Sequence, residues 1–306
     1  MDINTYINSS NFNQNPFQQE NVNKLNGLGD DIKAAVNENE EQINRFLSGD
    51  YVIKGKDKIL FEADEIKTLA PEQWISSGIL DLFLQSISAT ASTEKIYIFP
   101  VNFLPKLLEL EEDERNEMLK RFEKKYQGDL FCFEQLHFPL LGGCHFNLIS
   151  INRVFNDTKE EFFLMTPKCS LGRNLDDEVI ELLKIFKNFY EYKNQTKAFK
   201  HEQWHSPGGR GVGRAPQQTN NGNNCGAYVG FNIEMNVVKG IMYTKFNNAD
   251  ANTYRKYMAL KIMGFVNQSE GFSLVEKERP SKRKRVVRLM PRSKGSDFID
   301  LTEDSD

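Results

Sequence analysis

The sequence predicts an α+β domain, and three features of the chain lead to this class. Apolar side chains recur at helical spacing before residue 126 and again after about residue 179. Between them, near residues 130–166, short apolar runs are typical of strands. Both ends of the chain are polar or charged. We therefore expect one domain over residues 50–270, between arms at 1–49 and 271–306.

The elements of the first half follow from capping residues and apolar spacing. Residues 1–29 are rich in Asn and Gln and are expected to be disordered, because they offer little apolar surface. An aspartate at 30 or 31 then caps a short helix. Pro71 opens a second helix and Pro105 a charged amphipathic one, since proline suits the first helical turn. The apolar runs 59–61 and 95–99 are expected strands.

The second half begins with strands and ends with helices. Apolar runs predict strands at 130–133, 146–151, 161–166 and 198–204. Apolar residues at helical spacing then predict helices at 179–190, 225–238 and 253–265. A mixed or antiparallel sheet flanked by helices is expected for these parts only from a family resemblance, which residues 216–226 carry most clearly.

Composition limits the classes of function. The chain is 39% hydrophobic with 23 Phe, which is enough for a sizeable core, and its net charge of −4 does not suggest nucleic-acid binding. The four cysteines show no C-x-x-C spacing, so we expect neither a zinc site nor a disulfide framework, and no cofactor. No apolar run reaches membrane-spanning length. We expect an intracellular monomer with reduced thiols, away from membranes.

One cysteine stands in a context that favours catalysis. Cys225 lies between Asn224 and Gly226 at an expected helix start, where the helix dipole favours a thiolate. His145 opens an expected strand far upstream and is a candidate general base. Gln218 precedes the thiol, and its side-chain amide with the Cys225 N–H can form an oxyanion hole. Singly, such a Cys or His is more often structural, but their order together predicts a cysteine hydrolase.

Four blocks of the chain together resemble the ubiquitin-like-protein proteases, the papain-like cysteine peptidases that process or remove SUMO. The block Pro216 to Gly226 is similar to their Pro-Gln-Gln…Asp-Cys-Gly segment and is the most specific. Supporting blocks are 69–75, 96–104 and 145–148. The resemblance implies that Cys225 is the nucleophile, His145 the general base and Gln218 an oxyanion donor. It also implies a substrate that ends in Gly-Gly.

The chain departs from the family at three places. Thr166 aligns with the aspartate that orients the histidine, with Asn152 and Asp157 as other candidates in sequence. The family roofs its substrate tunnel with two tryptophans, which correspond here to Trp74 and Phe146. An Asn-Asp pair that helps hold the modifier is replaced by Ser76 and Ser77. These changes leave open which modifier is the substrate.

The C-terminal arm carries two short signals. Phe298, Ile299 and Leu301, followed by acids, resemble a SUMO-interaction motif, a short strand that adds to the edge of the SUMO sheet. The basic cluster Lys282 to Arg285 is typical of a nuclear-import signal, and it lacks the aromatic residues that would stack on nucleic acid bases. We expect a nuclear protein, with the cytoplasm as the alternative location.

The leading hypothesis is a cysteine isopeptidase or endopeptidase that cleaves after the Gly-Gly of SUMO or a related modifier. Its expected partners are that modifier and its conjugates. One alternative is a weak or inactive pseudo-protease that binds SUMO. Another is a protease of the same fold with a different substrate, of the viral maturation or deubiquitinase type.

Overall fold

The computed structural model describes residues 2–7, 24–56, 58–91, 95–156, 158–206, 222–239 and 243–277. Residues Met1–Glu276 belong to one compact unit and Lys277–Asp306 to a second. The first unit is wider than the expected 50–270 domain at both ends. No helix among the described residues combines the length and apolar character that crossing a membrane requires.

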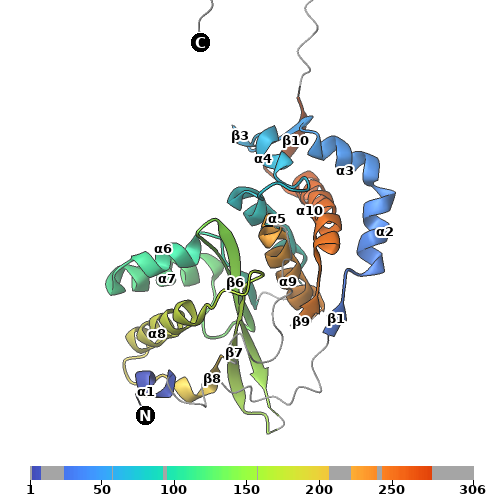
Figure 1. Cartoon of the computed structure of the whole chain (residues 1–306). Coiled ribbons are helices and arrows are strands. Elements are labelled where there is room, and N and C mark those ends of the chain that lie inside the picture. The colour runs from blue at the N-terminus through green and yellow to red at the C-terminus, as the bar shows by residue number, and fades with distance from the viewer. Residues whose placement is uncertain are drawn as a thin grey trace, which may run out of the picture. The chain divides into compact units, whose positions relative to one another are not determined.

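A five-stranded mixed sheet runs through the centre of the first unit (Figure 1). The middle strands pair antiparallel, while the outer pairs β4–β5 and β7–β8 are parallel. In spatial order the strands are β4 (Ile96–Ile98), β5 (Gln135–Gly142), β6 (His145–Phe155), β7 (Glu161–Lys168) and β8 (Trp204–His205). The expected α+β class, with a mixed sheet flanked by helices, is confirmed.

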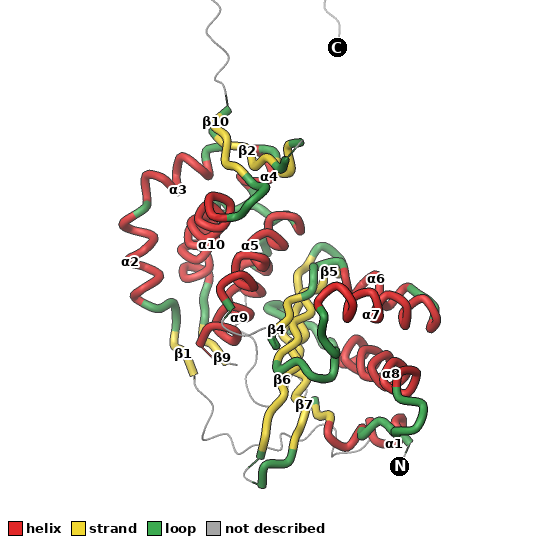
Figure 2. The backbone as a smooth tube through the Cα atoms, turned by 180° about the vertical axis from the view of Figure 1, so that it is seen from behind, coloured by secondary structure: helices red, strands yellow, loops and turns green. Residues whose placement is uncertain are grey.

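Each face of the sheet packs on its own helices, because successive side chains of a strand point to opposite sides. Phe146 and Leu148 of β6 belong to one apolar core, and Ile149 and Ile151 belong to the other. The two helical groups lie on opposite sides of the sheet (Figure 2). The first group contains α5 (Ser77–Thr90), α9 (Cys225–Lys239) and α10 (Asn248–Gln268). The second contains α6 (Phe103–Glu109), α7 (Glu112–Tyr126) and α8 (Asp176–Lys193).

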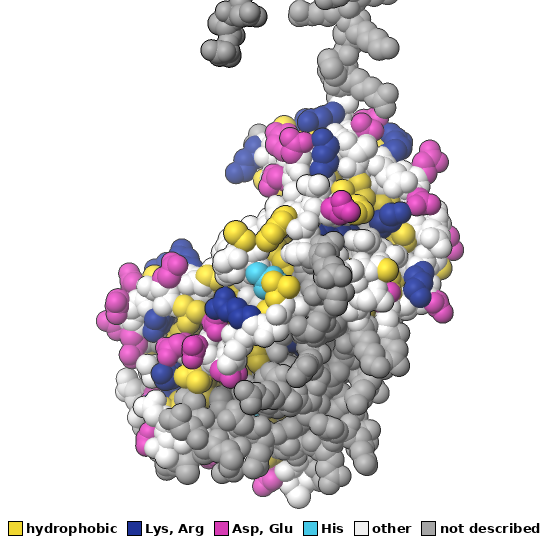
Figure 3. Space-filling view, viewed as in Figure 1, with side chains coloured by type: hydrophobic (Ala, Val, Ile, Leu, Met, Phe, Trp, Pro, Cys, Tyr) yellow, Lys and Arg dark blue, Asp and Glu magenta, His cyan; other side chains and the backbone are white. Residues whose placement is uncertain are grey.

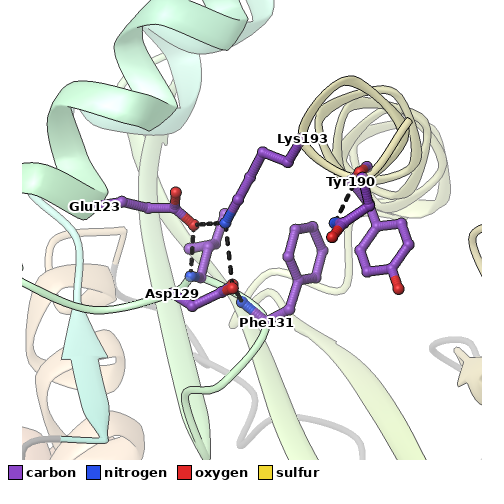
Figure 4. Close-up of polar contacts among 7 residues, drawn as sticks. Glu123, Asp129, Phe131, Tyr190 and Lys193 are labelled. Atoms are coloured by element: carbon purple, nitrogen blue, oxygen red, sulfur yellow. Dashed lines mark hydrogen bonds and ion pairs between the residues drawn. The ribbon is translucent and has the colours of Figure 1, made fainter. Parts of the chain in front are cut away.

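A charged cluster joins α7 to α8 at the edge of the second core (Figure 4). Lys193 Nζ lies 2.7 Å from Glu123 Oε1 and 3.2 Å from Asp129 Oδ2. The same Glu123 oxygen accepts the backbone N–H of Leu130 at 2.8 Å. The ammonium group also lies 5.8 Å from the Phe131 ring centroid, within cation–π range. Because these partners come from two helices and the loop before β5, the cluster fixes how the helical layer meets the sheet.

The N-terminal residues add elements that their composition does not suggest. Tyr6 is buried and its hydroxyl donates to the Trp204 carbonyl at 2.9 Å, so the short helix α1 is held against η2 and β8. Ile32 of α2 and Ile43 of α3 are buried in the first apolar core, and both helices pack against α10. The bounds are α1 (Ile3–Ile7), β1 (Lys24–Asn26), α2 (Asp30–Glu38), α3 (Glu40–Leu47), β2 (Tyr51–Lys54), β3 (Ile59–Phe61), α4 (Ala63–Lys67), η2 (His201–Gln203), β9 (Tyr243–Lys245) and β10 (Ser273–Glu276). Strand β1 pairs with β9, and β2 pairs with both β10 and β3.

Four expected elements differ in the structure. The helix expected from Pro105 is two helices, α6 and α7, and the strand expected at 198–204 is only β8, which follows the short helix η2. The helix expected from Pro71 begins at Ser77, because Ser76 caps it by accepting the Ile79 N–H at 3.2 Å. The preceding carbonyls are bonded to the Arg255 guanidinium instead of to helical N–H groups. The strand expected at 130–133 is a turn, and β5 starts at Gln135. The segment that carries Trp74 is therefore an ordered loop.

Candidate active site

Cys225 is the first residue of α9, where the sequence places it. The Asn224 carbonyl accepts the Tyr228 N–H at 3.0 Å, which closes the first helical turn. The Cys225 side chain is 2% exposed, and burial raises the pKa of its thiol. Backbone N–H groups of Phe146 and Gly226 bond to the sulfur and favour its thiolate, as does the charge of Arg255. Burial outweighs them, so the resting side chain is a thiol.

His145 is positioned by a tight hairpin. It pairs with Gly142 across the turn formed by Gly143 and Cys144, whose φ angles are +55° and +61°. Two successive positive φ values are characteristic of a type I′ turn, which matches the twist of the strands that it joins. The turn sets where β6 begins. Because the Phe146 N–H reaches the Cys225 sulfur, His145 is next in sequence to a residue that contacts the nucleophile.

The ring of His145 contacts a second thiol. Its Nε2 lies 3.5 Å from the Sγ of Cys169, which directly follows β7. The Cys169 sulfur also accepts the backbone N–H of Arg173 at 3.3 Å. The other ring nitrogen, Nδ1, is buried and has no hydrogen-bond partner among the described residues. Burial and the positive charge of Arg173 lower the pKa of His145, so its imidazole is neutral near pH 7.

The resting site therefore combines a neutral thiol with a neutral imidazole. The thiolate form of Cys225 is favoured by backbone N–H groups and by the charge of Arg255. The imidazole can accept a proton because it is neutral, and since its pKa is lowered while that of the thiol is raised, the proton stays on the sulfur until attack begins. Such a pair supports nucleophilic attack in which the base removes the proton as the sulfur–carbon bond forms.

Comparison with known structures shows the same architecture. The C-terminal Ulp1 protease domain in complex with Smt3, the yeast ortholog of SUMO, superimposes with a TM-score of 0.56 at 19% identity, over 74% of this chain and 94% of that one. The chain has the fold of a SUMO-protease catalytic domain. Ulp1 with its catalytic cysteine oxidized to a sulfinic acid gives 0.55 at 18% identity, over 74% and 94%. A structure described as the de-sumoylating protease gives 0.51 at 15%, over 71% and 93%.

The SUMO-protease fold confirms the resemblance that the sequence blocks suggest. No protein-family model matches the chain, and no curated protein matches it. The likeness thus lies in the three-dimensional structure more than in the sequence. At 15–19% identity it establishes the fold, while the roles of individual side chains depend on the contacts described above.

Within the SUMO-protease fold, Thr166 is not beside the histidine. It pairs with Ser150, five residues along β6 from His145 and about 17 Å away at 3.3 Å per residue. The expectation that Thr166 orients His145 is therefore wrong. Cys169, three residues later, is the side chain that makes the contact. Sequence spacing misplaces this position because the β6–β7 hairpin extends to Phe155 and Glu161, which makes both strands longer than expected.

The two expected tunnel aromatics differ in exposure. Trp74 is 50% exposed in the loop before α5, whereas Phe146 is buried. A Cβ at Gly226 would lie 3.2 Å from Ile75 and 3.4 Å from the Phe146 ring, so glycine permits these three segments to meet. Phe146 thus packs beneath the site and Trp74 stands at its surface. Hydrophobic and histidine side chains reach the surface together on the face shown in Figure 3.

The other residues singled out from the sequence lie outside the described residues. They are Gln218 before the nucleophile, and Phe298, Ile299 and Leu301 near the C-terminus. The structure thus brings Cys225 next to the strand that begins at His145, and it leaves the oxyanion donor and the tail motif as expectations. The sequence does not indicate Cys169 as a site residue, because a single cysteine after a strand belongs to no recognisable catalytic motif.

Proposed function

We propose that the protein is a cysteine isopeptidase or endopeptidase that cleaves after the Gly-Gly of SUMO or a related ubiquitin-like modifier. One observation carries the proposal: in a SUMO-protease fold, the Cys225 sulfur bonds to the N–H of Phe146, the residue after His145. The thiol of Cys225 at a helix start thus lies beside the strand start that carries His145, which supports their pairing in acyl transfer.

In the proposed mechanism, His145 takes the proton of Cys225 as the sulfur attacks the carbonyl carbon of the terminal glycine. The Cys225 N–H and the Gln218 side chain stabilise the oxyanion. The imidazolium then protonates the departing amine, and the C–N bond breaks to leave a thioester. Water, deprotonated by His145, attacks the thioester and releases the glycine carboxylate and the thiol.

Substrate selection rests on the exposed aromatic at the mouth of the site. Trp74 has the area and rigidity to cover a flat Gly-Gly segment and to exclude side chains by shape. Phe146 supports this cover from below, because it packs against the helix that carries Cys225. A modifier ending in Gly-Gly fits such a slot, whereas a bulky residue at either position does not.

The test uses SUMO, Nedd8 and ubiquitin, each bearing a thiol-trapping electrophile in place of the C-terminal carboxyl group. We expect the full chain to form a covalent adduct with one of them, at Cys225, and to hydrolyse the matching fluorogenic substrate. Adduct formation with ubiquitin or Nedd8 alone would favour a protease of the same fold with another substrate. Tight binding without any adduct would instead identify a pseudo-protease and overturn the proposal.

We further propose that the C-terminal arm assists the enzyme. Phe298, Ile299 and Leu301 would add a strand to SUMO and raise its effective concentration near the site. The basic cluster Lys282 to Arg285 would direct import into the nucleus. Deleting residues 297–306 should raise KM for SUMO conjugates without changing kcat, and deleting 282–285 should shift a fluorescent fusion to the cytoplasm.

The pH dependence of the reaction should respond to two charges beside His145. Arg173 lowers the pKa of His145, and Glu178 Oε1 lies 2.7 Å from Arg173 Nη2 and partly offsets its charge. Activity requires neutral imidazole, so it is lost as pH falls through the pKa of His145. Arg173→Gln should move this acid limb to higher pH, and Glu178→Gln should move it to lower pH.

The measurement is kcat/KM from pH 4 to 8, with the His145 ring titration followed by NMR. High salt should shrink both shifts, because the Arg173 side chain is half exposed. Shifts of the same sign in the two variants would contradict the assignment.

A further inference from the structure

Arg255 is a buried cation whose every donor is used. It lies on α10 and is 0% exposed. Its Nε donates to Asn224 Oδ1 at 2.7 Å. Its Nη1 donates to the carbonyls of Thr68 and Ala70, both at 3.0 Å. Its Nη2 donates to the carbonyl of Gln73 at 2.7 Å and to that of Asn223. The five N–H groups of a guanidinium are thus all satisfied.

The acceptors belong to two segments that are far apart in the sequence and that this side chain bonds together. The carbonyls at 68, 70 and 73 come from the loop that leads to Trp74. Asn223 and Asn224 directly precede Cys225. A further bond joins the same segments, from Asn223 Nδ2 to the Glu72 carbonyl at 2.5 Å. Glu72 has a φ of +64°, a conformation that costs free energy and persists only where surrounding contacts hold it.

The partners of the buried Arg255 guanidinium carry no negative charge. All five acceptors are neutral oxygens, four carbonyls and one side-chain amide. The Asn224 amide nitrogen is buried and has no hydrogen-bond partner among the described residues. The guanidinium therefore keeps a full positive charge close to Cys225, in surroundings where charges act more strongly than in water.

We propose that Arg255 is a positioning residue that clamps the Trp74 loop to the two residues before Cys225 and holds an uncompensated charge beside the sulfur. The substrate-facing aromatic and the nucleophile are then parts of one rigid assembly. The clamp also keeps the Asn224 carbonyl at the start of α9, and the charge supports the thiolate during attack. This inference rests on the proposed function for its consequence in turnover, but its effect on the thiol does not require a substrate.

Two variants separate the clamp from the charge. Asn224→Asp keeps an oxygen that accepts from Nε and adds a negative charge that offsets the guanidinium. Arg255→Lys keeps the positive charge but cannot donate to four carbonyls and an amide. Both are made in a background in which the exposed Cys132 and Cys144 are replaced by serine. Thermal unfolding of each variant checks that it is folded.

The first readout is the rate at which iodoacetamide alkylates Cys225 between pH 6 and 10, followed by mass spectrometry of the Cys225 peptide. Asn224→Asp should move the midpoint upward and slow alkylation at pH 7 about three- to tenfold, since one pH unit changes the thiolate fraction tenfold. Arg255→Lys should leave the midpoint near that of the wild type. An unchanged profile in Asn224→Asp overturns the role of the charge.

The second readout is hydrolysis of whichever modifier substrate the wild type accepts. Arg255→Lys should raise KM and lower kcat/KM about tenfold or more, because Trp74 and Cys225 lose their common support. Wild-type KM and kcat in folded Arg255→Lys overturn the clamp. If the wild type cleaves no modifier, the proposed function fails, while the alkylation profile still decides the role of the charge.

Discussion

Replacing Cys225 by alanine is expected to abolish hydrolysis of the modifier substrate, with a fall in kcat of at least about 10⁴-fold. The reason is chemical, since the Cys225 sulfur is the atom that forms the thioester in the proposed mechanism. Binding of the intact modifier should persist, because removing one buried sulfur leaves the surface around Trp74 unchanged. The measurement is single-turnover cleavage with the fluorogenic substrate, together with a binding isotherm for the uncleaved modifier.

Another cysteine provides a matched control for this experiment. Cys132 is exposed and lies outside the site, so its replacement by alanine should leave kcat within about twofold of the wild type. Adduct formation that survives in Cys225→Ala would assign the nucleophile to another thiol. It would also exclude the proposed geometry, in which the Phe146 N–H bonds to the reacting sulfur.

Replacing Cys169 by alanine is expected to lower kcat about 10- to 100-fold with little change in KM. The substitution removes the contact between Cys169 Sγ and His145 Nε2, at 3.5 Å, and leaves the ring free to turn away from Cys225. Cys169→Asp should restore kcat. Its carboxylate should also raise the pKa of His145 by stabilising the imidazolium, which moves the acid limb of kcat/KM to higher pH.

Thr166→Val is the control that distinguishes Cys169 from the position that sequence spacing favours. The Thr166 hydroxyl is buried without a hydrogen-bond partner among the described residues, so valine, which replaces it with a methyl group, breaks no hydrogen bond. This variant should keep wild-type kcat and pH dependence. Loss of activity in Thr166→Val with none in Cys169→Ala would refute the assignment.

The pKa shifts of Cys225 and His145 explain why the contact of Cys169 with the imidazole should affect kcat. Burial raises the pKa of Cys225 and lowers that of His145, so neither side chain is charged before the substrate binds. Proton transfer then depends on the alignment of the ring with the thiol, because no ion pair holds the two together. Cys169 and the type I′ turn at Gly143 and Cys144 are the features that fix this alignment.

Local sequence determined the elements whose signals are local. The start of α9 at Cys225 follows from an apolar run after polar residues, and β6 follows from alternation after His145. The residues of the Cys-Gly step and the histidine strand also sufficed for the resemblance that the fold confirms. A helix or strand with a consistent period can be predicted because each residue adds to the same signal.

Tertiary structure decided the features that depend on contacts between distant segments. The loop 68–76 is not a helix because Arg255, about 180 residues later, takes its carbonyls. Tyr6 orders the N-terminal helix through a carbonyl of β8. The partner of His145 is Cys169 and not Thr166 because strand register, set by the length of the β6–β7 hairpin, determines which side chains meet. The sequence by itself indicated the candidate nucleophile and base, while contacts between distant segments determine which residues position them.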